Sequence, residues 1–163
     1  MPAATKPISP KGEAEHLRWL VQSFVRSFGL LVTKETPCGQ PIAPSYAHAL
    51  MVLLERARDR SDTSQADLGS VLGIDKSNVT RLCSRMEAAD HVLQERAPND
   101  GRSRLLTLTP RGTRMAERIE KASHERFARI VAALPTDNRS TIFASLAALN
   151  EAVETLRDER PRQ

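Results

Sequence analysis

The sequence has few aromatic residues, few cysteines and no long apolar run. Its 163 residues include four Phe, one Tyr and one Trp, and the remaining apolar residues are mostly Ala, Leu, Val and Ile. This composition favours helix packing over a β-sandwich or barrel. Cys38 and Cys83 are too few for a disulfide framework. Residues 1–12 lack the apolar core of a signal peptide, and no run is long enough to span a membrane. We therefore expect a mainly α, cytoplasmic protein.

Motifs for catalysis or metal binding are also lacking. There is no glycine-rich phosphate loop and no nucleophile elbow, and the four histidines are scattered. A zinc site would have to draw Cys38, His48 and His124 from distant segments, without the spacing of a compact motif. The sequence therefore predicts neither an enzyme nor a bound metal or cofactor.

Positive charge is concentrated in one segment of the chain. The whole sequence has 24 basic and 20 acidic residues, a formal net charge of +4. Residues 96–118 contain six arginines against Asp100 and Glu117, so this segment alone carries an excess of four. Such a basic region suits a polyanionic partner. A solvated charged face is the alternative.

Apolar periodicity predicts an almost entirely helical chain. Residues 1–12, with three prolines, are expected to form a disordered arm. Apolar residues three and four apart then predict a first helix over 13–34 and a second over 45–58. Short helices are expected over 65–72 and after Asp75. A long helix is expected from Pro110, and a last one over about 140–157.

The segment "SQADLGSVLGIDKSNVTRLCSRME" has the form of a helix-turn-helix. Ser64 is predicted to cap the first helix with Asp67 as a capping-box partner, Gly73 to end it, and Asp75 to cap the second. The core between the helices would consist of Leu68, Leu72, Ile74, Val79 and Leu82. The polar outer face would consist of Ser77, Asn78, Thr80, Arg81 and Arg85. Small polar residues and arginines on one face suit base edges and phosphates, although a solvated face is again the alternative.

A β-hairpin is predicted directly after this motif. "HVLQERA" and "RLLTLT" read as strands joined by the turn "PNDGRS", which contains Asp-Gly. A hairpin after a helix-turn-helix makes a winged helix, whose wing lies beside the minor groove when the helix lies in the major groove. Arg102 and Arg104, expected at the wing tip, would then contact the narrow, negative minor groove. Asp100 would hold Arg102, or a neighbouring arginine, by a charge-assisted pair.

The segment from Ser64 to Gly112 resembles the MarR family of bacterial transcription regulators. The family's wing signature, Asp-x-Arg followed by Leu-Thr-x-x-Gly, is matched at Asp100, Arg102, Leu108, Thr109 and Gly112. The chain departs from the family where Asp90-His91 stands in place of the common Gly-Leu. Asp tolerates a left-handed cap less well than Gly, so we expect a different turn there.

The resemblance implies an architecture and a partner. A winged helix-turn-helix DNA-binding lobe would span residues 44–112. Residues 13–36 and 113–163 would form the helical dimerisation region. Two recognition helices about 34 Å apart would read a near-palindromic operator in double-stranded DNA, with Ser64, Gln65 and Arg85 contacting phosphates. A monomer with its terminal helices packed together is the alternative.

The resemblance also implies regulation, most often repression relieved by a small aromatic or phenolic anion. The candidate pocket residues are Arg18, Trp19, Tyr46 and His48; a merely packed or hydrogen-bonded His48 is the alternative. Cys38 and Cys83 are candidates for oxidant sensing, although Cys38 has no adjacent basic residue and Cys83 reads as a small core residue. A winged helix that binds protein instead of DNA remains a further alternative.

Overall fold

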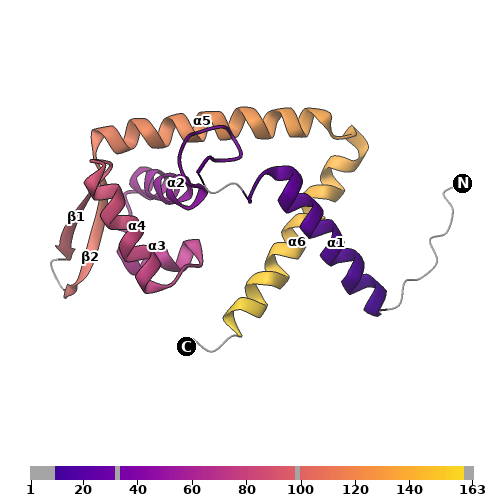
Figure 1. Cartoon of the computed structure of the whole chain (residues 1–163), viewed down its shortest axis with the longest axis horizontal. Helices are drawn as coiled ribbons and strands as arrows, with labels where there is room; N and C mark the ends of the chain where they lie inside the picture. The colour runs from indigo at the N-terminus through magenta and orange to yellow at the C-terminus, as the bar shows by residue number, and fades with distance from the viewer. Residues whose placement is uncertain (1–9, 32–33, 98–99, 160–163) are drawn as a thin grey trace, which may run out of the picture. The chain divides into compact units, whose positions relative to one another are not determined.

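A computed structural model describes residues 10–31, 34–97 and 100–159 (Figure 1). The helices are α1 (Pro10–Phe28), α2 (Pro44–Arg58), α3 (Gln65–Leu72), α4 (Lys76–Ala88), α5 (Pro110–Ala133) and α6 (Arg139–Asp158), with a 3-10 turn η1 at Thr136–Asn138. The strands are β1 (Val92–Ala97) and β2 (Asp100–Leu108). The chain forms two compact units, Met1–Ser123 and His124–Gln163. None of the described helices is long and apolar enough to cross a membrane.

Helix α1 differs from the predicted first helix at both ends. It begins at Pro10, so residues 10–12 of the predicted arm are helical, and residues 1–9 lie outside the described residues. It ends at Phe28 rather than near Lys34. Gly29 has a φ of +82°, and the N–H of Leu30 donates to the carbonyl of Val25 at 3.1 Å. A glycine in this left-handed conformation ends a helix. The predicted helix was too long because the apolar pattern in the sequence continues past this glycine.

The helix-turn-helix has the predicted bounds and caps. Ser64 and Asp67 form a complete capping box at the start of α3, and Gly73 follows its end with a φ of +65°. Asp75 caps α4 by accepting the backbone N–H of Asn78 at 2.9 Å. These signals act within one helical turn, which explains why the sequence located the motif accurately.

The two strands form an antiparallel hairpin, but the second strand begins earlier than predicted. Ala97 pairs with Asp100 and Val92 with Leu108, with a register shift after Arg96. Residues 100–103, predicted as turn, therefore belong to β2; residues 98 and 99 lie outside the described residues. Arg104 is consequently within the ladder, opposite Arg96, and not at the tip.

The core lies among α2, α3, α4, the hairpin and the start of α5, which Figure 1 shows gathered together. Leu50, Leu68, Met86 and Ile119 are fully buried. The predicted inner faces are largely confirmed: Val79, Leu82, Cys83 and Met86 of α4 are buried, as is Leu68, while Leu72 and Ile74 are half-buried. This core fixes α4 beside the hairpin, so the two predicted DNA-contacting elements are held together.

Large apolar side chains on α1 and α6 are exposed within their own units. Phe24 of α1 is 54% exposed, and Phe143 and Leu146 of α6 are each 51% exposed. The same holds for Leu17, Trp19, Leu20, Val21, Val153 and Leu156. Monomeric proteins rarely leave so many large apolar residues in water, so these faces need a partner.

Candidate nucleic-acid interface

The predicted contact residues of α4 lie together on its solvent-facing side. One face of α4 packs on the core, and the opposite face is open to solvent. All five residues predicted on this outer face are exposed: Ser77, Asn78, Thr80, Arg81 and Arg85. The pattern of α4 thus produced a helix with one apolar and one polar face. A polar face on the second helix of a helix-turn-helix is the surface that enters a major groove.

Hydrogen bonds along this face hold its first two turns in place. The Ser77 hydroxyl donates to Asp75 at 2.7 Å, and the amide of Asn78 also donates to that carboxylate. A guanidinium N–H of Arg81 donates to the side-chain oxygen of Asn78 at 3.0 Å. The hydroxyl of Thr80 donates to the carbonyl of Lys76 at 2.8 Å. Most of the predicted contact groups are therefore already oriented by their own helix.

Asp75 is a stable anion at the start of α4. The backbone N–H of Asn78, followed by the Ser77 hydroxyl, lowers the pKa of the Asp75 carboxyl to about 2. Hydrogen bonds that donate to a carboxylate stabilise its charged form, and the adjacent helix N-terminus adds to this effect. At neutral pH the cap is fully ionised.

Ser64 and Gln65 lie half-buried at the start of α3. The backbone N–H of Asp67 donates to the Ser64 hydroxyl oxygen at 3.1 Å, and that hydroxyl donates to the Asp67 carboxylate at 2.7 Å. The amide of Gln65 donates to Gln94 of β1, and Gln94 donates to Glu87 of α4 at 2.8 Å. Two of the three residues predicted to contact phosphates, Ser64 and Gln65, are thus engaged within the lobe, and Gln65 links α3 to the wing.

The wing brings two arginines face to face. Arg96 of β1 and Arg104 of β2 are cross-strand partners, and both side chains are exposed. Like charges directly opposite each other destabilise a hairpin. Asp100 and Arg102 lie at the start of β2, and their predicted side-chain pairing lies outside the described part of the structure. A wing that concentrates cations in this way favours an anionic partner.

The four residues predicted to share a ligand pocket have different surroundings in the structure. Tyr46 is 6% exposed, and its hydroxyl lies 2.7 Å from Nδ1 of His91. His48, on the same helix, instead lines a cavity of about 370 Å³. Arg18 and Trp19 are exposed on α1. The other residues that line this cavity are Met51, Val52, Glu55, Arg58 and Glu120. Arg58 and Glu120 of this lining are paired with each other, with N···O distances of 2.6 and 2.7 Å.

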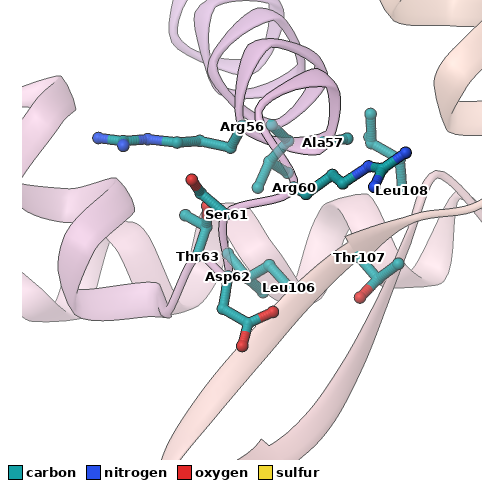
Figure 2. Close-up of a pocket in the computed structure, with 10 residues that line it drawn as sticks. Arg56, Ala57, Arg60, Ser61, Asp62, Thr63, Leu106, Thr107 and Leu108 are labelled. Atoms are coloured by element: carbon teal, nitrogen blue, oxygen red, sulfur yellow. The ribbon is translucent and has the colours of Figure 1, made fainter.

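A second cavity, of about 220 Å³, lies between the end of α2 and strand β2 (Figure 2). Arg60 in this region has a φ of +54°, which is unusual for a residue with a side chain. Figure 2 shows the side chains of Arg56 and Arg60 extending in opposite directions. The buried hydroxyl of Thr63 has no hydrogen-bond partner among the described residues. The two arginines do not converge on a common anion.

The two cysteines have different environments. Cys83 is completely buried, and this burial raises the pKa of its thiol to about 11. Cys38 is half-buried, with its sulfur 3.1 Å from the Thr36 hydroxyl. A thiol reacts as the thiolate, so Cys83 is poorly reactive in the folded protein. Among the residues that the structure describes, no three His, Cys, Asp or Glu side chains are grouped to hold a metal.

His91 is a residue of the site that sequence reasoning missed. Asp90 adopts a φ of +56°, so the turn after α4 is left-handed and the expected change of turn is wrong. The chain continues into His91, whose side chain reaches Tyr46, 45 residues earlier. The sequence signal was a polar residue at a position where the family commonly has leucine. The partner could not be identified because no local pattern connects the two positions.

Comparisons with known proteins agree with this geometry. A model of the MarR family matches residues 41–103. A probable transcriptional regulator from Pseudomonas aeruginosa is 20% identical over 83% of this chain and 98% of its own, with a TM-score of 0.67. The PcaV regulator of Streptomyces coelicolor, solved with its natural ligand, is 24% identical over 94% of this chain and 99% of its own, with a TM-score of 0.56.

A further similar structure is a complex with DNA. MepR of S. aureus, solved in an MepR–DNA complex, is 16% identical over 90% of this chain and 99% of its own, with a TM-score of 0.62. No curated protein matches the chain. At these identities the solved structures establish the fold, and the family model adds the sequence match. Residues 41–103 therefore belong to the MarR family of winged-helix transcription regulators, as the wing and helix-turn-helix motifs predicted.

Proposed function

We propose that this protein is a homodimeric, sequence-specific DNA-binding repressor that a small aromatic anion releases from its operator. The wing carries this proposal: Arg96 and Arg104 are exposed and directly opposite each other. Their repulsion costs stability unless an anion lies against them, and DNA phosphates supply that charge. The polar outer face of α4 lies on the adjacent element and would enter the major groove.

The exposed apolar faces of α1 and α6 support a second copy of the chain as partner. Phe24, Phe143 and Leu146 are each at least half exposed within their own units. Covering such side chains stabilises an assembly by about 25 cal/mol per Å² of apolar surface removed from water. A twofold dimer would set two recognition helices about 34 Å apart, so the operator would be a near-palindrome.

The cavity beside His48 supports binding of the effector. Its lining includes the apolar residues Met51 and Val52 and also Arg58, which is paired with Glu120. An aromatic carboxylate would place its ring on the apolar residues and compete with Glu120 for the guanidinium. The similar PcaV structure was solved with a natural ligand. The burial of Cys83 disfavours that thiol as an alternative, oxidant-driven trigger.

Fluorescence anisotropy with duplex DNA tests the proposal. The upstream region of the protein's own gene is titrated across a salt series, then with salicylate-like anions and with peroxide. We expect tight binding that resists competitor DNA and weakens steeply with salt. Weak binding that ignores sequence would indicate that the wing contacts a protein instead.

The wing is tested by one substitution and a matched control. Arg102→Ala should weaken DNA binding by about 1–3 kcal/mol and reduce the salt slope by about one unit. Lys11→Ala removes an exposed cation of α1 that lies outside both the predicted DNA-binding lobe and the predicted dimerisation region, and should change neither. Unchanged affinity in Arg102→Ala would refute the role of the wing. Sedimentation velocity tests the dimer, and a monomer at micromolar concentration would refute it.

A further inference from the structure

Three side chains connect the buried lobe to the outer face of the recognition helix. Tyr46 of α2 is buried, and its hydroxyl lies 2.7 Å from Nδ1 of His91, with the two rings edge to face at 83°. The guanidinium carbon of Arg85 lies 6.0 Å from the centroid of the Tyr46 ring. A cation over an aromatic ring at this distance is attracted to it. Arg85 is exposed on α4, so Tyr46 contacts a group that faces solvent.

The backbone around His91 is fixed from both sides. The N–H of His91 donates to the carbonyl of Met86 at 2.9 Å, and the carbonyl of His91 accepts the N–H of Thr109 at 3.1 Å. The hydroxyl of Thr109 donates to the carbonyl of Asp90 at 2.7 Å. These bonds connect the end of α4 to the start of α5. The backbone of His91 is therefore fixed, and its imidazole lies against Tyr46.

The charge state of His91 determines what it does to Tyr46. Burial, and after it the positive charge of Arg111, lowers the pKa of His91; Arg118 acts in the same direction and Asp90 opposes it. Neutral His91 accepts a hydrogen bond at Nδ1 from the Tyr46 hydroxyl, which enriches the Tyr46 ring in electrons. Protonated His91 donates at Nδ1 instead and places a second cation near the ring. The first state attracts the Arg85 guanidinium, and the second repels it.

We propose that Tyr46 and His91 are a positioning pair that holds Arg85 in place for DNA binding. Neutral His91 fixes and polarises Tyr46, and the ring holds Arg85 over the C-terminal half of α4. Arg81, one turn earlier, is held differently, by Ser77 and Asn78 of its own helix. Protonation of His91 releases Arg85 while leaving Arg81 in place. The proposal rests on the proposed DNA-binding function.

A double-mutant cycle separates positioning from a purely structural bond. Tyr46→Phe keeps the buried ring and removes the hydroxyl that contacts His91. The probe is a duplex that the wild-type protein selects from a random pool, with an unselected duplex of equal length for comparison. Tyr46→Phe should weaken binding to the selected duplex measurably, by no more than the about two- to fivefold that loss of a whole exposed cation–π contact would cause. The same change should have no effect in an Arg85→Ala background.

Arg81→Ala is the matched control, because Arg81 is held by its own helix. In that background Tyr46→Phe should keep its full effect. An equal loss in the Arg85→Ala background would show that Tyr46 acts on the fold in general, and would overturn the proposal. No loss in the wild-type background would overturn it as well. Far-UV circular dichroism at each step establishes that every variant is folded.

The pH profile provides a readout that a structural bond would not change. The DNA affinity of wild type divided by that of Arg85→Ala should fall as pH decreases from 7.5 to 5. The DNA affinity of Tyr46→Phe divided by that of the double variant Tyr46→Phe/Arg85→Ala should not change with pH. A ratio independent of pH in both pairs would refute the role of His91.

An NMR titration keeps this proposal distinct from the proposed function. The Nε–Hε signal of Arg85 should titrate together with the His91 ring in the free protein, and Tyr46→Phe should abolish that coupling. If no duplex is selected from the pool, DNA binding is refuted, and the NMR result still decides whether the pair holds Arg85. An Arg85 signal that is independent of His91 would refute the pair.

Discussion

A methyl group at Gly112 would collide with the backbone of His91. An ideal Cβ built at Gly112 lies 1.9 Å from the carbonyl oxygen of His91 and 2.8 Å from its carbonyl carbon. Gly112 is in the first turn of α5, and its N–H donates to the Thr109 hydroxyl at 2.9 Å. Because the colliding atom belongs to backbone, no side-chain rotation relieves the contact. Glycine is required there by the close approach of α5 to the turn after α4.

The cost of Gly112→Ala follows from these distances. Ordinary contact begins at 3.4 Å, so the two atoms must separate by 3.4 minus 1.9, or 1.5 Å. That movement strains the hydrogen bonds that Thr109 makes to Asp90 and His91, each worth about 1 kcal/mol. Overpacking adds about 1–3 kcal/mol, and the better helix propensity of alanine returns about 1 kcal/mol. We therefore expect the free energy of unfolding to fall by about 2–4 kcal/mol.

Urea unfolding followed by circular dichroism measures this change, at one protein concentration because dimer stability depends on concentration. Gly69→Ala in α3 is the matched control. Its Cβ would lie 3.3 Å from a methyl carbon of Val79 and 3.4 Å from the carbonyl oxygen of Ile74, so we expect a change within about 1 kcal/mol. If Gly112→Ala were as stable as wild type, or no worse than Gly69→Ala, the steric reasoning would be refuted.

Three further predictions concern the caps and the thiols. Ser64→Ala removes the capping box of α3 and should lower the free energy of unfolding by about 1 kcal/mol in urea; unchanged stability would contradict it. The folded state lowers the pKa of Asp75 to about 2, so its stabilisation is complete above the usual carboxyl pKa and is lost as pH falls toward 2. Asp75→Asn should flatten the stability profile in that range, and a profile like that of wild type would exclude Asp75 as its source. In a thiol titration Cys38 should react in the native protein, and Cys83 only after unfolding, because Cys83 is buried and the pKa of its thiol is raised to about 11. Two fast native thiols would refute the burial of Cys83.

Local chemistry determined much of the DNA-binding lobe. The bounds of α3, the caps at Ser64 and Asp75, and the left-handed Gly73 depend on interactions within about one helical turn. The inner face of α4 follows from apolar spacing, and Pro110 begins α5 as predicted. Such signals are complete in the sequence because both partners of each interaction are close in the chain.

The sequence did not determine where strand β2 begins or where the first helix ends. Strand β2 extends back to Asp100 because its partner β1 supplies the ladder, although residues 100–103 have turn chemistry. The first helix ends at Phe28 because Gly29 turns left-handed, although the apolar pattern continues. In both places backbone hydrogen bonding determined where the element ends, and the local sequence pattern indicated a different position.

The sequence alone therefore determined the family resemblance, the helix-turn-helix and the polar face of α4, because these depend on spacing along the chain. Only the tertiary structure placed Arg104 opposite Arg96 and brought Tyr46 to His91 and Arg85. Residues 46 and 91 are 45 positions apart, and no periodic pattern connects them. Their contact depends on how the shared core positions α2 and the turn after α4.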